Sequence, residues 1–181
     1  MDGWAWILFP PWRQARGGSF WTPPRVIIMI PGMKFLDYTT VKGFLPQIKC
    51  RELREVVAAL VETLQAEGVV QDGESLTREV LRREAADSTA IGAGLVLPHA
   101  RCRDLKSVHL AVATLAEPLD LEAPDGRPVD VVIMLVGPQG DPREMLRVLA
   151  RLARLVKGDS FLDDLRVAAD GPAMRQLFLD A

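Results

Sequence analysis

The sequence is poor in the residues that build metal clusters and disulfide frameworks. Its 181 residues include two cysteines and two histidines. Cys50 and Cys102 lie far apart and outside any paired-ligand spacing, so we predict no disulfide framework, and a reducing cytoplasm fits the chain. A zinc site made of both cysteines with His99 and His109 is the weaker alternative, because no Cys-x-x-Cys or His-x-x-x-His pair organises such ligands. We therefore predict idle thiols, no metal and no cofactor.

A strong net charge and long apolar runs are also missing. The formal net charge is -2, which gives no reason to expect nucleic acid or an anionic membrane as a partner. No apolar run approaches the roughly 20 residues that a membrane helix needs, so no direct membrane insertion is expected. The content of 49% hydrophobic and 25% charged residues is ordinary for a globular protein. The length suits one domain with a sizeable core.

Residues 1–37 differ in composition from the rest. They hold all four tryptophans, several prolines and a Gly-Gly pair. An early acidic residue and a Pro-Pro pair do not fit a signal peptide, and prolines interrupt every candidate helix or strand. We expect a disordered tail, or a start codon assigned too early with Met33 as the true start. A hydrophobic arm that binds a partner is the competing interpretation. The domain itself is expected at 38–181.

Helical periods of apolar residues alternate with short apolar runs along that domain. The expected helices are 53–68, 75–84, 141–158, 160–169 and 172–179, and the expected strands are 95–97, 108–115 and 129–136. Ser75 and Asp141 are the candidate N-caps of their helices, and the helix after Asp141 is expected to bury Leu146. The last strand is apolar on both faces, as in a central strand. These patterns predict an α/β fold, a three-layer α/β/α sandwich with a small mixed central sheet.

One segment carries the chemistry. It reads Arg83-Glu84, Ser88-Thr89, Ile91-Gly92-Ala93-Gly94 and Leu97-Pro98-His99-Ala100-Arg101. Pro98 ends the short strand, and so sets His99 at a strand end. Imidazole keeps a neutral, nucleophilic nitrogen near pH 7, and flanking guanidiniums can hold a phosphoryl group. The other ring nitrogen then needs a hydrogen-bond acceptor, so that one tautomer presents its lone pair.

This order of residues resembles the phosphorylation-site signature of a known family. The family is the type 2 enzyme IIA domains of the bacterial phosphotransferase system, the fructose, mannitol and nitrogen-regulatory class. The segment from Glu117 to Val136 is similar to the family's second half. The resemblance implies a phosphocarrier in which His99 accepts a phosphoryl group from the phosphohistidine of the carrier HPr and passes it to a IIB domain. Arg83 matches the family's active-site arginine, which neutralises the phosphoryl oxygens.

Other residues of the segment are candidates for supporting roles. Thr89 and the backbone amides around Gly92 and Gly94 can act as neutral donors to phosphate. Arg101 is a further candidate cation, and a solvated charge is its alternative role. For His109 we expect an ordinary surface or packed histidine.

The sequence departs from the family at one position. Family members usually carry a second active-site histidine where this chain has Met145, and a thioether cannot donate a hydrogen bond to phosphate. Arg143, Arg147 or His109 are candidates to compensate. We expect Met145 near the cleft and outside the deep core.

Two classes of function remain open. One is a phosphocarrier, in sugar transport or in the nitrogen-regulatory branch. The other is a regulatory module on the same scaffold, which binds a target protein with little or no phosphotransfer. A chain without an attached IIB or membrane domain favours the regulatory branch.

Overall fold

The computed structural model describes residues 34–140, 142–158 and 160–180. Its helices are the short 3-10 turn η1 (Phe35–Tyr38), α1 (Leu53–Ala66), α2 (Gly73–Ala86), α3 (Arg143–Leu155), α4 (Phe161–Val167) and α5 (Gly171–Leu179). Its strands are β1 (Thr39–Ile48), β2 (Ala90–Gly92), β3 (Leu95–Val96), β4 (His99–Cys102), β5 (His109–Leu119) and β6 (Val129–Pro138). The tail expected at residues 1–37 lies, as far as residue 33, outside the described residues.

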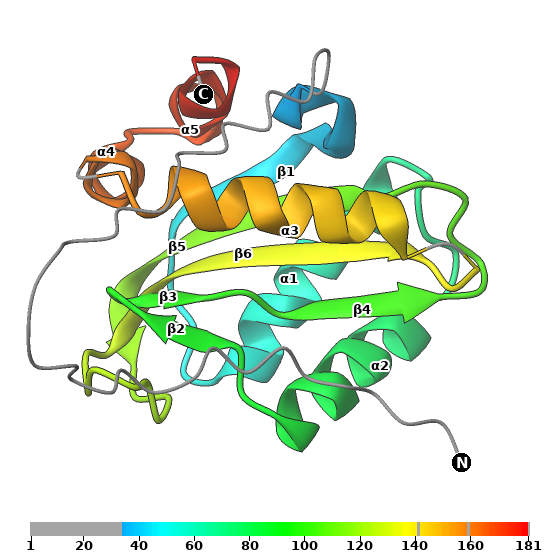
Figure 1. Cartoon of the computed structure of the whole chain (residues 1–181), viewed down its shortest axis with the longest axis horizontal. Helices are drawn as coiled ribbons and strands as arrows, with labels where there is room; N and C mark the ends of the chain where they lie inside the picture. Colours follow the sequence, from blue (N-terminus) through cyan, green and yellow to red (C-terminus); the bar gives the residue numbers. More distant parts are fainter. Residues whose placement is uncertain (1–33, 141, 159, 181) are drawn as a thin grey trace, which may run out of the picture. The chain divides into compact units, whose positions relative to one another are not determined.

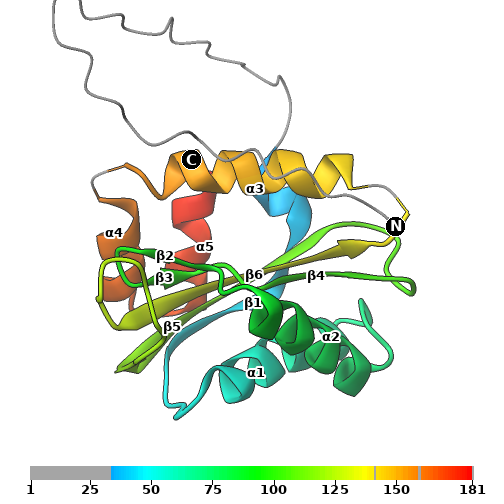
Figure 2. The same ribbon diagram turned by 60° about the horizontal axis from the view of Figure 1, so that its bottom comes forward.

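These elements form three layers (Figure 1). The sheet lies in the middle, with α1 and α2 on one face and α3, α4 and α5 on the other (Figure 2). Parallel and antiparallel pairs are mixed, since β5 runs antiparallel to β6 whereas β3 and β4 run parallel to it. The predicted α/β/α sandwich with a mixed central sheet is confirmed. None of the described helices is long and apolar enough to cross a lipid bilayer.

The strand order places β6 at the centre. The order is β1-β5-β6-β3-β2, and β4 also pairs with β6. Leu95 of β3 lies opposite Val131 and His99 of β4 lies opposite Leu135, so β3 and β4 follow successive stretches of the same neighbour. They are two halves of one strand, interrupted at Pro98. The expectation that the strand ends before His99 is therefore wrong, because pairing resumes at the histidine.

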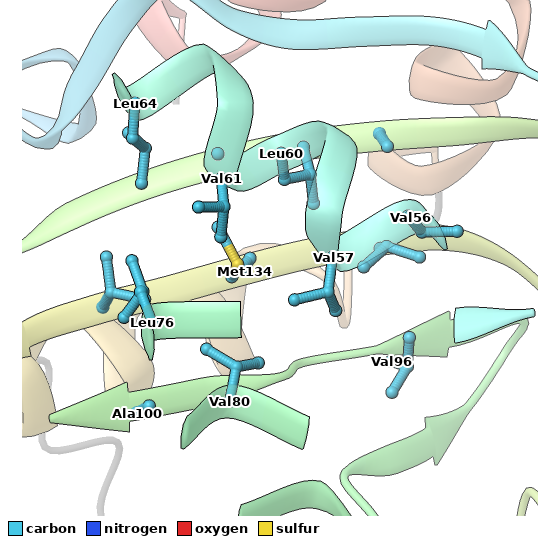
Figure 3. Packing of buried hydrophobic residues seen from close by; sticks show 14 of the residues in the cluster. Val56, Val57, Leu60, Val61, Leu64, Leu76, Val80, Val96, Ala100 and Met134 are labelled. Carbon is cyan, nitrogen blue, oxygen red and sulfur yellow. The ribbon is translucent and has the colours of Figure 1, made fainter. Parts of the chain in front are cut away.

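Alternating side chains of β6 divide the interior into two cores. Val132, Met134 and Val136 face α1 and α2, where five apolar residues of α1 are almost completely buried (Figure 3). Val131, Ile133 and Leu135 of β6 face α3, α4 and α5. In this second core the ring of Phe178 contacts the ring of Phe35 at a centroid distance of 5.7 Å. Burial on both faces confirms the predicted central strand.

Two strands and one cap differ from the sequence predictions. β1 was not predicted, and β2 forms within the segment expected to be a loop. The N-cap of α2 is Asp72, whose carboxylate accepts the Ser75 amide at 2.9 Å, because the helix begins earlier than expected. Ser75 is thus the capped residue and not the cap. Asp141, the other expected cap, lies outside the described residues.

Candidate functional site

His99 is the first residue of β4 and is half-buried. The next residue, Ala100, belongs to the core under α1 and α2, where Figure 3 labels it. Side chains alternate along a strand, so His99 and Arg101 lie on the opposite face, toward α3. The structure thereby brings two of the predicted site residues to one face of one strand.

A backbone carbonyl fixes the tautomer of the His99 ring. Nδ1 lies 2.9 Å from the carbonyl oxygen of Leu97. A carbonyl oxygen can only accept, so Nδ1 carries the proton and Nε2 carries the lone pair. Among the residues that the structure describes, none hydrogen-bonds Nε2. The ring is therefore arranged as a nucleophile at Nε2.

Arg83 lies in the last turn of α2, the helix that packs against β4. Its Nη1 donates to the carbonyl oxygen of Asp87 at 2.9 Å. Among the described strands, β4 pairs with β6 alone, so the other edge of β4 is open beside His99. Helix α2, which carries Arg83, packs against the strand that carries His99.

Thr89 is held by a neighbour that the sequence analysis missed. The amide of Thr89 donates to Oε1 of Glu84 at 2.7 Å, and its hydroxyl donates to Oε2 of the same carboxylate. The side chain of Thr89 is thus committed to Glu84 and not turned toward a phosphate. The motif places Glu84 five residues before Thr89, but the sequence alone does not show that the two side chains meet.

The glycine-rich turn lies far from the histidine. Gly92, Ala93 and Gly94 all have positive φ, and the amide of Ala93 donates to the carboxylate of Asp125 at 2.7 Å. This hydrogen bond lowers the pKa of Asp125. His99 lies five positions beyond Gly94 along the chain, on the order of 15 Å at about 3.3 Å per residue of strand. The expectation that these amides assist His99 is wrong, because the turn joins β2 to β3 at the far end of the strand.

Met145 is a core residue, contrary to expectation. It is 4% exposed, and its sulfur packs over the backbone of Gly137 on β6. Leu146, expected to be buried, is instead 60% exposed. Glu144 accepts a hydrogen bond from the Tyr38 hydroxyl at 3.2 Å on one side of α3. Because successive helix residues are about 100° apart, Leu146 projects from the other side, toward β4.

His109 lies on the wrong face to replace a second active-site histidine. It pairs with Val136 in the same row as Ala100, so it faces α1 and α2. Its Nε2 lies 2.9 Å from the Ser107 hydroxyl, and burial lowers its pKa. The sheet thus separates the two histidines, which also separates the ligands of the zinc site considered above.

Arg147 lies on the exposed face of α3, near Tyr38. Burial raises the pKa of Tyr38, Glu144 raises it further, and the charge of Arg147 lowers it. Arg143 is exposed at the start of α3 and lies four residues before Arg147, so the two arginines share one face of the helix.

The fold and site define an α/β domain that presents one nitrogen of a tautomer-fixed imidazole beside an open sheet edge. The family model described as "Phosphoenolpyruvate-dependent sugar phosphotransferase system, EIIA 2" matches residues 38–181, and the chain belongs to this family. A nitrogen regulatory protein of Bradyrhizobium diazoefficiens is 31% identical over 142 residues, which is 78% of this chain and 92% of the relative.

Solved structures agree with the fold. The nitrogen regulatory protein IIA-Ntr of Neisseria meningitidis has a TM-score of 0.72 at 22% identity, covering 78% of this chain and 97% of that one. Mannitol IIA of Escherichia coli has a TM-score of 0.66 at 16% identity, in a structure of its complex with phosphorylated mannitol IIB. The match covers 78% of this chain and 97% of that one.

Proposed function

We propose that this protein is a phosphocarrier in which Nε2 of His99 accepts a phosphoryl group. The observation that carries the proposal is the hydrogen bond from Nδ1 to the carbonyl of Leu97. It leaves a lone pair on Nε2 while the ring is neutral, which is the form that attacks phosphorus. Membership of the EIIA type 2 family supports the same reaction.

The transfer needs little covalent help from the protein. A bond forms between Nε2 and phosphorus as the bond between phosphorus and the donor's ring nitrogen breaks, and the donor leaves as a neutral imidazole. Nδ1 keeps its proton throughout, held by Leu97. Positioning and charge stabilisation supply most of the catalysis. We assign the charge stabilisation to Arg83 from the open edge of β4, with Arg101 as a second cation on the face of His99.

The proposed partners are an HPr-like donor and a IIB domain or regulatory target. The β4 side of α3 carries exposed Leu146 and half-buried Leu149, and these apolar side chains suit transient docking beside His99. The nitrogen regulatory protein of Bradyrhizobium diazoefficiens matches this chain over 92% of its own length. We therefore place the chain in the regulatory branch, acting in the cytoplasm.

Phosphorylation by phosphoenolpyruvate, enzyme I and HPr tests the proposal. We expect one acid-labile phosphate per wild-type chain and none in His99→Ala. Arg83→Ala should slow labelling by about ten- to a thousandfold, the range for loss of one oriented donor. Arg82→Ala is the matched control, because Arg82 pairs with Glu79 on the exposed side of α2 and should label at the wild-type rate. Persistent label in His99→Ala would overturn the assignment.

The second candidate function is a regulatory module with little or no phosphotransfer. The observation that favours it is Met145, which is buried and cannot assist a phosphoryl group. A wild-type protein that does not label with its cognate HPr would support this function over the first.

A further inference from the structure

Glu84 organises the segment that precedes the strand of His99. Its carboxylate accepts three hydrogen bonds from two consecutive residues. They come from the Thr89 amide at 2.7 Å, the Thr89 hydroxyl and the Ser88 hydroxyl at 3.3 Å. Thr89 is 7% exposed, so its polar atoms depend on protein partners for most of their hydrogen bonding. Glu84 is thus the main acceptor for an almost buried threonine.

A chain of hydrogen bonds leads from this carboxylate to the imidazole. The carbonyl of Thr89 accepts the Leu97 amide at 3.2 Å. The carbonyl of the same Leu97 accepts the His99 ring at Nδ1, at 2.9 Å. In each of Thr89 and Leu97 the backbone N–H donates to the previous partner and the backbone C=O accepts from the next one. Three contacts therefore join Glu84 to the ring nitrogen that fixes the tautomer.

The neighbouring arginine holds the same segment from its other end. Arg83 binds the carbonyl of Asp87, while Glu84 binds Thr89. The two adjacent side chains of α2 together hold residues 87–89, of which Thr89 hydrogen-bonds Leu97. This explains why Arg-Glu and Ser-Thr occur together in the motif.

We propose that Glu84 is a positioning residue for phosphoryl acceptance, acting on His99 through Thr89 and Leu97. The inference rests on the proposed function of His99 as acceptor. Without Glu84 the amide and hydroxyl of Thr89 lose their acceptor, so the residue whose carbonyl holds the Leu97 amide is less firmly placed. The ring then populates the tautomer with the proton on Nε2, which has no lone pair for phosphorus.

The ring tautomer is measured directly by long-range proton–nitrogen NMR of the unphosphorylated protein. With two histidines in the chain, His109→Gln assigns the spectrum. We expect wild-type His99 to show a protonated Nδ1 and an unprotonated Nε2. Glu84→Ala should shift both nitrogens toward the Nε2-protonated form, and Glu84→Gln should restore most of the wild-type pattern because its amide oxygen can still accept the Thr89 amide.

Phosphorylation kinetics give the second readout. Glu84→Ala should label about ten- to a hundredfold more slowly than wild type, the scale of a misplaced reacting group. Glu79→Ala is the matched control, since this glutamate of the same helix pairs with Arg82 and should change neither tautomer nor rate. Glu84 also lines an open groove of about 520 Å³, so truncating it leaves no sealed cavity.

The two readouts separate the two proposals. A wild-type chain that cannot be phosphorylated overturns the role of His99, whereas the tautomer measurement still tests Glu84. Unchanged tautomer and rate in Glu84→Ala, with a wild-type protein that labels, overturn the role of Glu84 alone. If Glu84→Ala does not fold, Thr89→Val tests the same contact, because it removes one of the two hydrogen bonds that hold Thr89 to Glu84 and should shift the tautomer in the same direction by a smaller amount. An unchanged tautomer in Thr89→Val, together with an unchanged rate, would then contradict the inference.

Discussion

At the residue scale, the site depends on which way neighbouring side chains point. Met145 and Leu146 are adjacent and both apolar, yet the first is 4% exposed and the second 60%. The spacing of apolar residues along α3 could not show which of the two is buried. A helix with either residue on its inner face would present an apolar stripe to the sheet. The tautomer of His99 was likewise invisible in the sequence, although the need for an acceptor was predictable. Which carbonyl supplies it depends on the turn of the chain at Pro98.

Replacing each of these two residues by histidine tests that Met145 is buried and that Leu146 is exposed. Met145→His buries an imidazole in the α3 core and should lower the free energy of unfolding by about 2 to 3 kcal/mol. Leu146→His should change it by less than about 0.5 kcal/mol, since the side chain is exposed. It should also speed phosphoryl acceptance by up to about a hundredfold, because it adds a donor on the side of His99. Urea unfolding and labelling rates measure both effects, and equal destabilisation by the two changes would contradict the account.

At the element scale, α2 matters most because it packs against β4 and carries Arg83 and Glu84 in its last turn. The sequence predicted this helix from its apolar spacing, whereas the role of Arg83 beside His99 came from the family resemblance and stays a prediction. It did not predict where the helix begins, because Asp72 and Ser75 are both good N-caps. The motif also made His99 and Arg83 candidate site residues but gave Glu84 no role, since its contact with Thr89 appears only in the folded chain.

The capping of α2 can be tested with two substitutions three residues apart. Asp72→Ala removes the acceptor of the Ser75 amide and should destabilise the protein by about 1 kcal/mol. Ser75→Ala keeps that hydrogen bond, because the backbone of Ser75 is the donor, and should be close to neutral. Thermal unfolding of the two variants gives the comparison. A larger loss in Ser75→Ala than in Asp72→Ala would restore Ser75 as the cap.

At the scale of the whole molecule, the sheet separates two faces with different chemistry. The sequence predicted the layers and the central strand, because alternating and continuous apolar runs reflect burial. It could not assign the two histidines to opposite faces, since that depends on the register of β4 and β5 against β6. The two histidines therefore have different roles. His99 lies on the face of the proposed phosphoryl transfer, and His109 lies among residues that stabilise the fold.

His109 should make folding stability depend on pH. Burial lowers its pKa below the usual 6.5, so the unfolded chain binds the proton more readily than the folded protein. Above pH 6.5 both states are neutral and the effect vanishes. As the pH falls below 6.5, stability is lost until the pH reaches the folded pKa. Urea unfolding from pH 8 to pH 5 should therefore show a smaller loss in His109→Gln than in wild type, with pH 8 as the baseline. Parallel curves for the two proteins would show that His109 is not the cause.

The most direct test of the central claim is the position of the phosphoryl group on the imidazole. The wild-type protein is phosphorylated through phospho-HPr, and nitrogen and phosphorus NMR then identify the bonded ring atom. The account predicts phosphorus on Nε2 of His99, with Nδ1 still protonated and held by Leu97. Phosphorus on Nδ1, or on any other residue, would contradict it.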